Sequence, residues 1–273
     1  MSKRTILLVT ILILGGTLLF GQTSRKGDLL IGISVGPNFS NLRGSLDRTE
    51  EFEQIFGQEG YDTGLFKDMR LGISTGIQLE YFLVDNLSLK SGVYYENKGM
   101  DLSSSRSEDG FLPYEPSLTY AGSITDKYKR EVKNNYLSVP ILLRKYFSSG
   151  KSFFVEGGCY FSQLINSQID YTYSLYQVEY EGVSEKDHTN KLDYGFILGT
   201  GYVKRLNDQF RFEVEMLFNY GLRKIDSKFD NQVESLPPTT GRLADVKDYY
   251  GLNSNAKNIS FSINLGISYR IGK

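Results

Sequence analysis

The sequence predicts an all-β fold: an eight-stranded antiparallel up-and-down transmembrane β-barrel with long extracellular loops and short periplasmic turns. Three observations predict it. The chain begins with an export signal, eight later segments alternate large apolar residues with small or charged ones, and tight connections recur only after the even-numbered segments.

Composition agrees with a strand-rich chain. Among 273 residues there are 20 Tyr, 17 Phe and 28 Gly but only 6 Pro, a mixture that favours strands and close turns over helices. The net charge is −1, so no overall positive field draws the protein to nucleic acid or another polyanion. We therefore expect no nucleic-acid partner.

The N-terminal residues resemble a secretory signal. Lys3 and Arg4 precede an apolar run over residues 6–20, and Gly21 is a small residue at the expected cleavage position. We predict a signal peptide over 1–21 and a barrel domain over 22–273, with an uncleaved anchor as the alternative. Cys159 is the only cysteine, which excludes an intramolecular disulfide and leaves no cysteine near residue 21 for lipoprotein processing.

The last two segments, 209–220 and 259–271, alternate most regularly. In the first, one face carries large apolar groups and the other carries charges: Phe210, Phe212, Val214, Met216, Phe218 and Tyr220 against Arg211, Glu213, Glu215 and Asn219. In the second, apolar residues oppose a small hydrophilic face of Ser260, Ser262, Asn264, Gly266, Ser268 and Arg270. A period of two with apolar groups outside and polar groups inside is typical of a barrel in a membrane.

Six further segments fit the same template: 28–36, 69–83, 87–100, 132–147, 152–165 and 191–205. The fourth segment is the least regular, because Pro140 and Leu142 place apolar groups on both faces. Since Pro140 cannot donate a ladder hydrogen bond, we predict a β-bulge at that residue.

Connection lengths are a second, independent signal. The links after strands two, four and six are short (84–86, 148–151 and 206–208), whereas those after odd strands are long and polar (about 37–68, 101–131, 166–190 and 223–258). Short periplasmic turns, long extracellular loops and two belts of aromatic residues near the strand ends are typical of outer-membrane barrels. A secreted β-sandwich or a soluble lipocalin-like barrel is the alternative.

Charged residues of both signs are expected to point inward: Arg70, Glu80, Lys90, Glu96, Lys98, Arg144, Glu156, Asp193, Arg205, Arg211, Glu213, Glu215 and Arg270. An eight-stranded barrel is just wide enough to be filled by side chains. We therefore expect a plug of compensating ion pairs, with a proton or small-ion path as the alternative. Cys159 is expected to face lipid or neighbouring strands.

No catalytic, cofactor-binding or metal-binding residue is predicted, and the chain is not expected to be an enzyme. His188 is the only histidine, and Ser184, the nearest serine, lacks a nucleophile motif, although a lipid-modifying hydrolase of the small-barrel type remains an alternative. One histidine and one cysteine cannot build a zinc site. The acidic residues Asp47, Glu50, Glu51 and Glu53 lack the spacing of a calcium loop.

Three short motifs resemble the PorT-like outer-membrane β-barrel family of the Bacteroidetes. They are residues 32–42 (GISVGPNFSNL), 135–146 (NYLSVPILLRKY) and the closing 265–271 (LGISYRI). The resemblance covers essentially the whole mature chain and implies a barrel located in the outer membrane. The family's founding member is associated with the secretion and maturation of exported proteases, so the resemblance also implies a link to secretion.

The loop surface is where a function is expected. Seven tyrosines lie among polar residues in the long connections: Tyr114, Tyr120, Tyr128, Tyr171, Tyr173, Tyr176 and Tyr180. Tyrosine suits interfaces because it combines apolar area with a hydrogen-bonding group. We expect a non-enzymatic barrel in outer-membrane lipid that contacts envelope or secretion-system proteins through its loops or periplasmic rim. A narrow small-solute channel is a further alternative.

Overall fold

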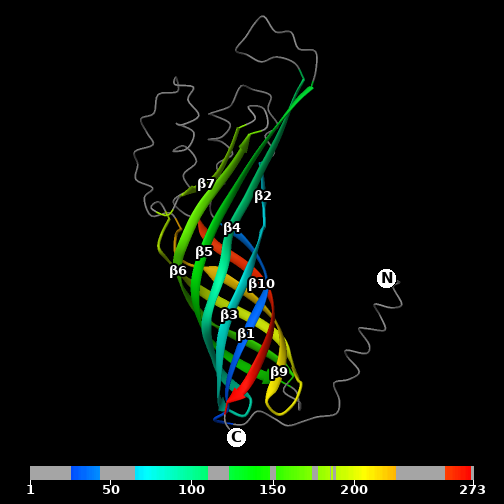
Figure 1. Ribbon diagram of the computed structural model, residues 1–273, viewed down its shortest axis with the longest axis vertical. Coiled ribbons are helices and arrows are strands. Elements are labelled where there is room, and N and C mark those ends of the chain that lie inside the picture. Colours follow the sequence, from blue (N-terminus) through cyan, green and yellow to red (C-terminus); the bar gives the residue numbers. More distant parts are fainter. Residues whose placement is uncertain are drawn as a thin grey trace, which may run out of the picture.

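The computed structural model describes residues 26–43, 65–109, 123–147, 152–173, 178–184, 186, 189–225 and 256–271. All of its regular structure is β (Figure 1). Eight strands form the barrel: β1 (Leu29–Arg43), β3 (Arg70–Val84), β4 (Leu87–Asp109), β5 (Ser123–Phe147), β6 (Phe153–Tyr173), β8 (Leu192–Arg205), β9 (Phe210–Gly221) and β10 (Lys257–Ile271). Two shorter strands, β2 (Leu65–Asp68) and β7 (Val178–Ser184), pair with β4 and β6.

The barrel is closed and antiparallel throughout. Neighbouring barrel strands pair in chain order, and β1 pairs with β10 over a register that runs from Leu29 opposite Ile271 to Arg43 opposite Lys257. Each of the eight predicted segments is one barrel strand, which confirms the predicted fold. Among the described residues, no helix is long and apolar enough to cross a membrane.

The distribution of exposed and buried side chains is the reverse of that in a water-soluble domain. Large apolar groups point outward and are exposed, as for Ile33 (65%), Leu71 (63%) and Leu198 (64%). Lys90, Arg144 and other charged residues lie inside and are almost completely buried. This pattern matches a wall whose outer face contacts lipid, and it excludes the soluble sandwich and the lipocalin-like barrel.

Four strands run beyond the segments that the sequence indicated. β1 continues to Arg43, β4 to Asp109 and β6 to Tyr173, while β5 begins at Ser123. The long connections were therefore predicted to be too long, because 37–43, 101–109, 123–131 and 166–173 are strand. In Figure 1 this part of the sheet, with β2 and β7, rises above the closed barrel.

Pro140 does not produce the predicted bulge. Its neighbours keep one register toward β4 (Ser91 opposite Ile141, Tyr94 opposite Ser138). The register also continues across Pro140 toward β6, and the shift in this strand pair occurs at Asn135 and Tyr136 instead. The ladder pairing with β4 is interrupted at Pro140, which has no N–H to donate, and the Ser91 hydroxyl donates a hydrogen bond to the Pro140 carbonyl there, at 2.8 Å.

The two ends of the barrel differ as predicted. β3 and β4 are joined by the tight turn Asp85–Asn86, and residues 206–209 join β8 to β9. We assign this end to the periplasm, since short turns are found there in outer-membrane barrels. Outer-face aromatic residues line this end, where Phe153 packs edge-on against Tyr202 and Phe210 packs against Tyr269, both with ring centroids 5.1 Å apart.

Candidate functional site

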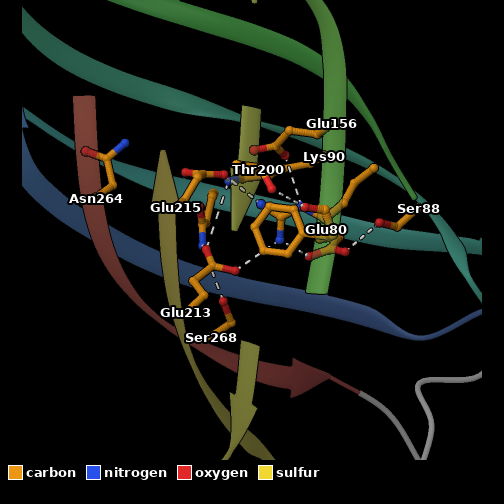
Figure 2. Close-up of polar contacts among 12 residues, drawn as sticks. Glu80, Ser88, Lys90, Glu156, Thr200, Glu213, Glu215, Asn264 and Ser268 are labelled. Carbon is orange, nitrogen blue, oxygen red and sulfur yellow. Dashed lines mark hydrogen bonds and ion pairs between the residues drawn. The ribbon is translucent and has the colours of Figure 1, made fainter. Parts of the chain in front are cut away.

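Arg144 on β5 is the centre of a charged cluster in the lumen. Its guanidinium donates to four glutamates on three other strands: Glu156 Oε2 at 2.9 Å, Glu213 Oε2 at 3.0 Å, Glu80 Oε2 at 3.3 Å and Glu215 Oε1 at 2.7 Å. All five side chains are buried. Figure 2 shows the four carboxylates converging from different parts of the wall.

Two further cations complete this lower cluster, which we define as Glu80, Lys90, Arg144, Glu156, Arg211, Glu213 and Glu215. Lys90 on β4 crosses the lumen to Glu215, and Arg211 on β9 pairs with Glu80. Because isolated buried charges are costly, this dense pairing is required for the lumen to fold around them.

Glycines on the inner wall make room for these side chains. A Cβ at Gly199 on β8 would lie 2.6 Å from Leu217 Cδ2 and 3.0 Å from Glu156 Oε1. A Cβ at Gly266 on β10 would lie 2.8 Å from Glu213 Cγ. The charged side chains therefore occupy space left by glycines at the paired positions of the neighbouring strands.

An upper cluster of Glu96, Lys98, Tyr160, Asp193 and Asn258 lies nearer the extracellular end. Lys98 Nζ is 2.9 Å from Glu96 Oε2 and 3.8 Å from Asp193 Oδ2. It also lies 4.4 Å from the centre of the Tyr160 ring, a cation–π geometry. The Tyr160 hydroxyl donates to Asp193 at 3.1 Å, and the Asn258 amide donates to the same oxygen at 2.8 Å.

A small cavity separates the two clusters. It is lined by Lys90 from below, Glu96 from above, and Ser138, Tyr160 and Asn219 from the sides, among other residues. The volume open to the centre of a water molecule is about 10 Å³, which suffices for roughly one water.

Apolar side chains close the lumen on both sides of the charges. At the periplasmic end, five buried residues pack together: Leu30, Phe82, Tyr146, Phe154 and Val203. Toward the extracellular end, the buried apolar residues are Leu42, Met100, Val132, Leu164, Ile169, Ile225 and Ala256. The described lumen is thus a filled core, as the sequence predicted, and not an open pore.

A second group of charges lies on the outer face, on the extracellular side of the exposed apolar residues. Glu131 is its centre, with Lys129, Lys133 and Arg70 around it and Lys133 also paired with Asp170. The hydrogen bond from Lys129, followed by that from Lys133, holds the pKa of the Glu131 carboxyl down at about 2. Hydrogen bonding to Asp170 raises the pKa of Lys133.

Glu131→Gln is expected to lower the melting temperature of the barrel at neutral pH and to make no difference near pH 2. The folded pKa of Glu131, about 2, is below its ordinary value of 4.5. Its stabilisation is therefore complete above about 4.5 and is lost as the pH falls through the folded value. Circular dichroism melts of both proteins in detergent across this range measure the difference.

Glu181, an exposed residue on β7, is the matched control. The same substitution there is expected to change the melting temperature little at any pH. A difference at Glu131 that persists undiminished to the most acid samples would contradict the role assigned to this carboxylate.

Most residues predicted to point inward do so, but Arg70 is an exception. Its guanidinium lies 3.0 Å from Asp101 and 3.5 Å from Glu131, on the side of the outer-face charges. The regular pairing of β3 with β4 ends at Ser74, and Gly99 has a positive φ of 147°. Arg70 Cδ lies 3.2 Å from where a Cβ of Gly99 would be, so the absence of that side chain gives Arg70 its path.

Other predicted residues are placed as follows. Arg270 is near the periplasmic end, 3.4 Å from Asp28, and Cys159 is half-buried between outward-facing neighbours. Ser184 is exposed at the end of β7. His188 and the acidic residues Asp47, Glu50, Glu51 and Glu53 lie outside the described residues.

The described part of the chain contains no group of three or more His, Cys, Asp or Glu side chains placed to hold a metal ion.

The sequence did not lead us to predict the neutral hydrogen-bond partners of the lower cluster. Tyr146 donates to Glu80, Gln78 donates to Glu213, and Ser88 donates to Glu80. The signal was available, because these residues share the inward parity of the charged ones.

The sequence matches one protein-family model. Residues 20–227 match the model of the outer membrane protein beta-barrel domain. No curated protein sequence matches the chain significantly.

Solved structures with similar folds include the outer membrane protein OprG from Pseudomonas aeruginosa, at 13% identity, covering 93% of this chain and 100% of that chain with a TM-score of 0.38. Neisserial surface protein A matches at 9% identity, covering 89% of this chain and 97% of that chain with a TM-score of 0.40. The family match extends over most of the chain, and the closed wall with an apolar outer face is what that family describes. The protein belongs to the family of outer membrane proteins with a β-barrel domain.

Proposed function

We propose that this protein is a non-enzymatic outer-membrane barrel that contacts other envelope or secretion-system proteins through its extracellular side. The observation that carries the proposal is the extension of β4, β5 and β6 beyond the apolar part of the wall. The outward apolar residues of β5 end at Leu137, yet the strand begins at Ser123. At ~3.3 Å per residue, the polar extension is roughly 40 Å of strand.

The extension has the properties of a presenting surface. β2, β4, β5, β6 and β7 form one continuous sheet in this region. Hydrogen bonds between neighbouring strands therefore hold the backbone of the extension in place outside the membrane. Its register places Tyr128 opposite Tyr173 and Tyr171 opposite Tyr180. Tyrosines on a preformed scaffold favour protein contacts because little conformational entropy is lost on binding.

The extracellular side is favoured over the periplasmic rim because the described periplasmic connections are tight turns. They offer little area compared with the extended sheet. A small-solute channel is opposed by the two apolar layers that close the lumen. A secretion-associated role follows from the resemblance to PorT-like barrels and belongs to the same proposal.

A photo-crosslinking amino acid placed at Lys129 tests the proposal in living cells. Lys129 is exposed on the outer face of the β5 extension. We expect ultraviolet light to give protein adducts whose partner is identified by mass spectrometry. In a second variant, residues 103–129 are replaced by a short turn and the crosslinking amino acid is placed at Glu131. The adduct with the partner is expected to be absent from this variant.

Ile141 is the matched control, because it lies on the same strand and is exposed on the lipid-facing wall. Crosslinking from this position is expected to give lipid adducts without the partner. Barrel integrity in each variant is checked by heat-modifiable migration in SDS gels. If neither Lys129 nor other positions of the extension yield a protein adduct, the proposal is wrong.

A further inference from the structure

We propose that Glu156 and Glu215 share one proton, so that the lower cluster contains a neutral carboxylic acid hydrogen-bonded to a carboxylate in the closed lumen. This proton-binding site is independent of the extracellular contacts proposed above. It follows from the charge balance of the cluster and from the positions of four oxygen atoms.

The lower cluster has four carboxyl groups (Glu80, Glu156, Glu213 and Glu215) against three cations (Lys90, Arg144 and Arg211). Of the other titratable groups next to it, Tyr94 and Tyr146 are neutral phenols in their ordinary state. Arg205, opposite Arg211 at the periplasmic end, interacts with Asp28 and Asp208. β1, β8 and β10 line this level with glycine, serine and asparagine, as Figure 2 shows for Asn264 and Ser268.

The upper cluster supplies no compensating charge. It contains one cation, Lys98, against Glu96 and Asp193, and is itself short of positive charge. Apolar layers separate the lower cluster from water at its periplasmic end. A fourth negative charge would therefore be buried without a partner, which is costly enough for a proton to be retained instead.

Hydrogen bonding identifies which carboxyl groups hold the proton. Glu80 accepts from Ser88 and Tyr146 on one oxygen and from Arg144 and Arg211 on the other. Glu213 also has both oxygens occupied, by Gln78 and Arg144. These two glutamates are fully supplied with donors and are the ionised members of the cluster.

Glu156 and Glu215 differ from them. Each gives one oxygen to the same guanidinium, with Arg144 Nε 2.9 Å from Glu156 Oε2 and Arg144 Nη2 2.7 Å from Glu215 Oε1. Their other oxygens, Glu156 Oε1 and Glu215 Oε2, are buried and receive no donor from the described residues. The two carboxyl groups lie within hydrogen-bonding reach of one another. Two carboxyl groups can form such a bond only if one of them is protonated.

The backbone is arranged to allow this approach. Glu156 is on β6 and Glu215 is on β9, with β8 between them. On β8, Gly199 pairs with Glu156 and Gly201 pairs with Glu215. A Cβ at Gly199 would lie 3.0 Å from Glu156 Oε1, so glycine at this position leaves room for the carboxyl group to reach across.

Infrared spectroscopy of the purified barrel in detergent tests the proposal. A protonated carboxyl group has a C=O stretching band distinct from carboxylate bands, and labelling glutamate with ¹³C at its side-chain carboxyl separates it from aspartate. We expect a ¹³C-sensitive protonated-glutamate band at pH 7, where an exposed glutamate is ionised. Glu156→Gln is expected to abolish this band, as is Glu215→Gln, since either change removes the shared proton.

Glu131→Gln is the matched control, because Glu131 is an ion-paired glutamate on the outer face. This variant is expected to retain the band at full intensity. The wild-type spectrum alone can overturn the proposal, whether or not the lumen variants fold, if it contains no protonated-glutamate band at pH 7. A band that survives in both folded lumen variants would equally contradict the assignment to this pair.

Discussion

Replacing Arg144 with methionine is expected to destabilise the folded barrel by about 3–5 kcal/mol, the range for removing one partner of a buried ion pair. Methionine keeps much of the side-chain volume but leaves Glu80, Glu156, Glu213 and Glu215 without their common cation. Lys90 and Arg211 are already engaged and cannot reach all four. Urea-induced unfolding in detergent, followed by circular dichroism, measures the change.

Arg270→Met is the matched control. Arg270 lies near the periplasmic end, is partly exposed and makes one ion pair, at 3.4 Å from Asp28. Its loss is expected to cost no more than about 1 kcal/mol. Arg144→Lys is expected to fall between the two, because an ammonium group keeps the charge but loses the planar fork that serves several carboxylates at once. Equal stabilities of Arg144→Met and wild type would contradict the central role of this arginine.

The wall of the barrel could be predicted from the sequence because each strand separates two very different surroundings. Phe212, Val214 and Met216 contact lipid while Arg211, Glu213 and Glu215 face the lumen, so a period of two is visible in the residue types themselves. The same parity gave the inward direction of Arg144 and Glu156. Residue type and direction together were enough to predict a charged plug.

The strand extensions could not be predicted for the opposite reason. Beyond Tyr95 on β4 and before Leu137 on β5, the outer face of the sheet carries polar residues such as Asp101, Glu131 and Lys133. The contrast between an apolar outer face and a polar inner face therefore disappears although the ladder continues. β2 and β7 could not be predicted from the sequence for the same reason. The direction of Arg70 also escaped prediction, because it depends on a local interruption of pairing and on the space beside Gly99.

The proton-sharing pair required the three-dimensional register. Sequence parity shows that Glu156 and Glu215 both point inward, as do Glu80 and Glu213. It does not show which of these carboxyl groups meet, because that depends on the stagger of β6, β8 and β9 around the barrel. The register places Glu156 and Glu215 beside the guanidinium of Arg144. It also leaves one oxygen of each carboxyl group without a donor among the described residues.

Leu198→Arg is expected to destabilise the barrel by about 2–4 kcal/mol when it is folded in a lipid bilayer, the range for an arginine facing lipid near the midplane. Leu198 is 64% exposed on the outer face of β8. Along the same face it lies midway between Tyr194 and Tyr202, which mark the two interfaces. An arginine at this depth must bring its charge into hydrocarbon or deform the bilayer around itself.

Leu192→Arg on the same strand provides the control. Leu192 is also exposed on the outer face, but it lies beyond Tyr194 at the extracellular end. There an arginine reaches the headgroup region, so the expected cost is only about 0–1 kcal/mol. Reversible urea unfolding from lipid vesicles measures both variants. Because the two substitutions are chemically identical, their difference reports depth alone, and equal costs at the two positions would contradict the placement of β8 across the membrane.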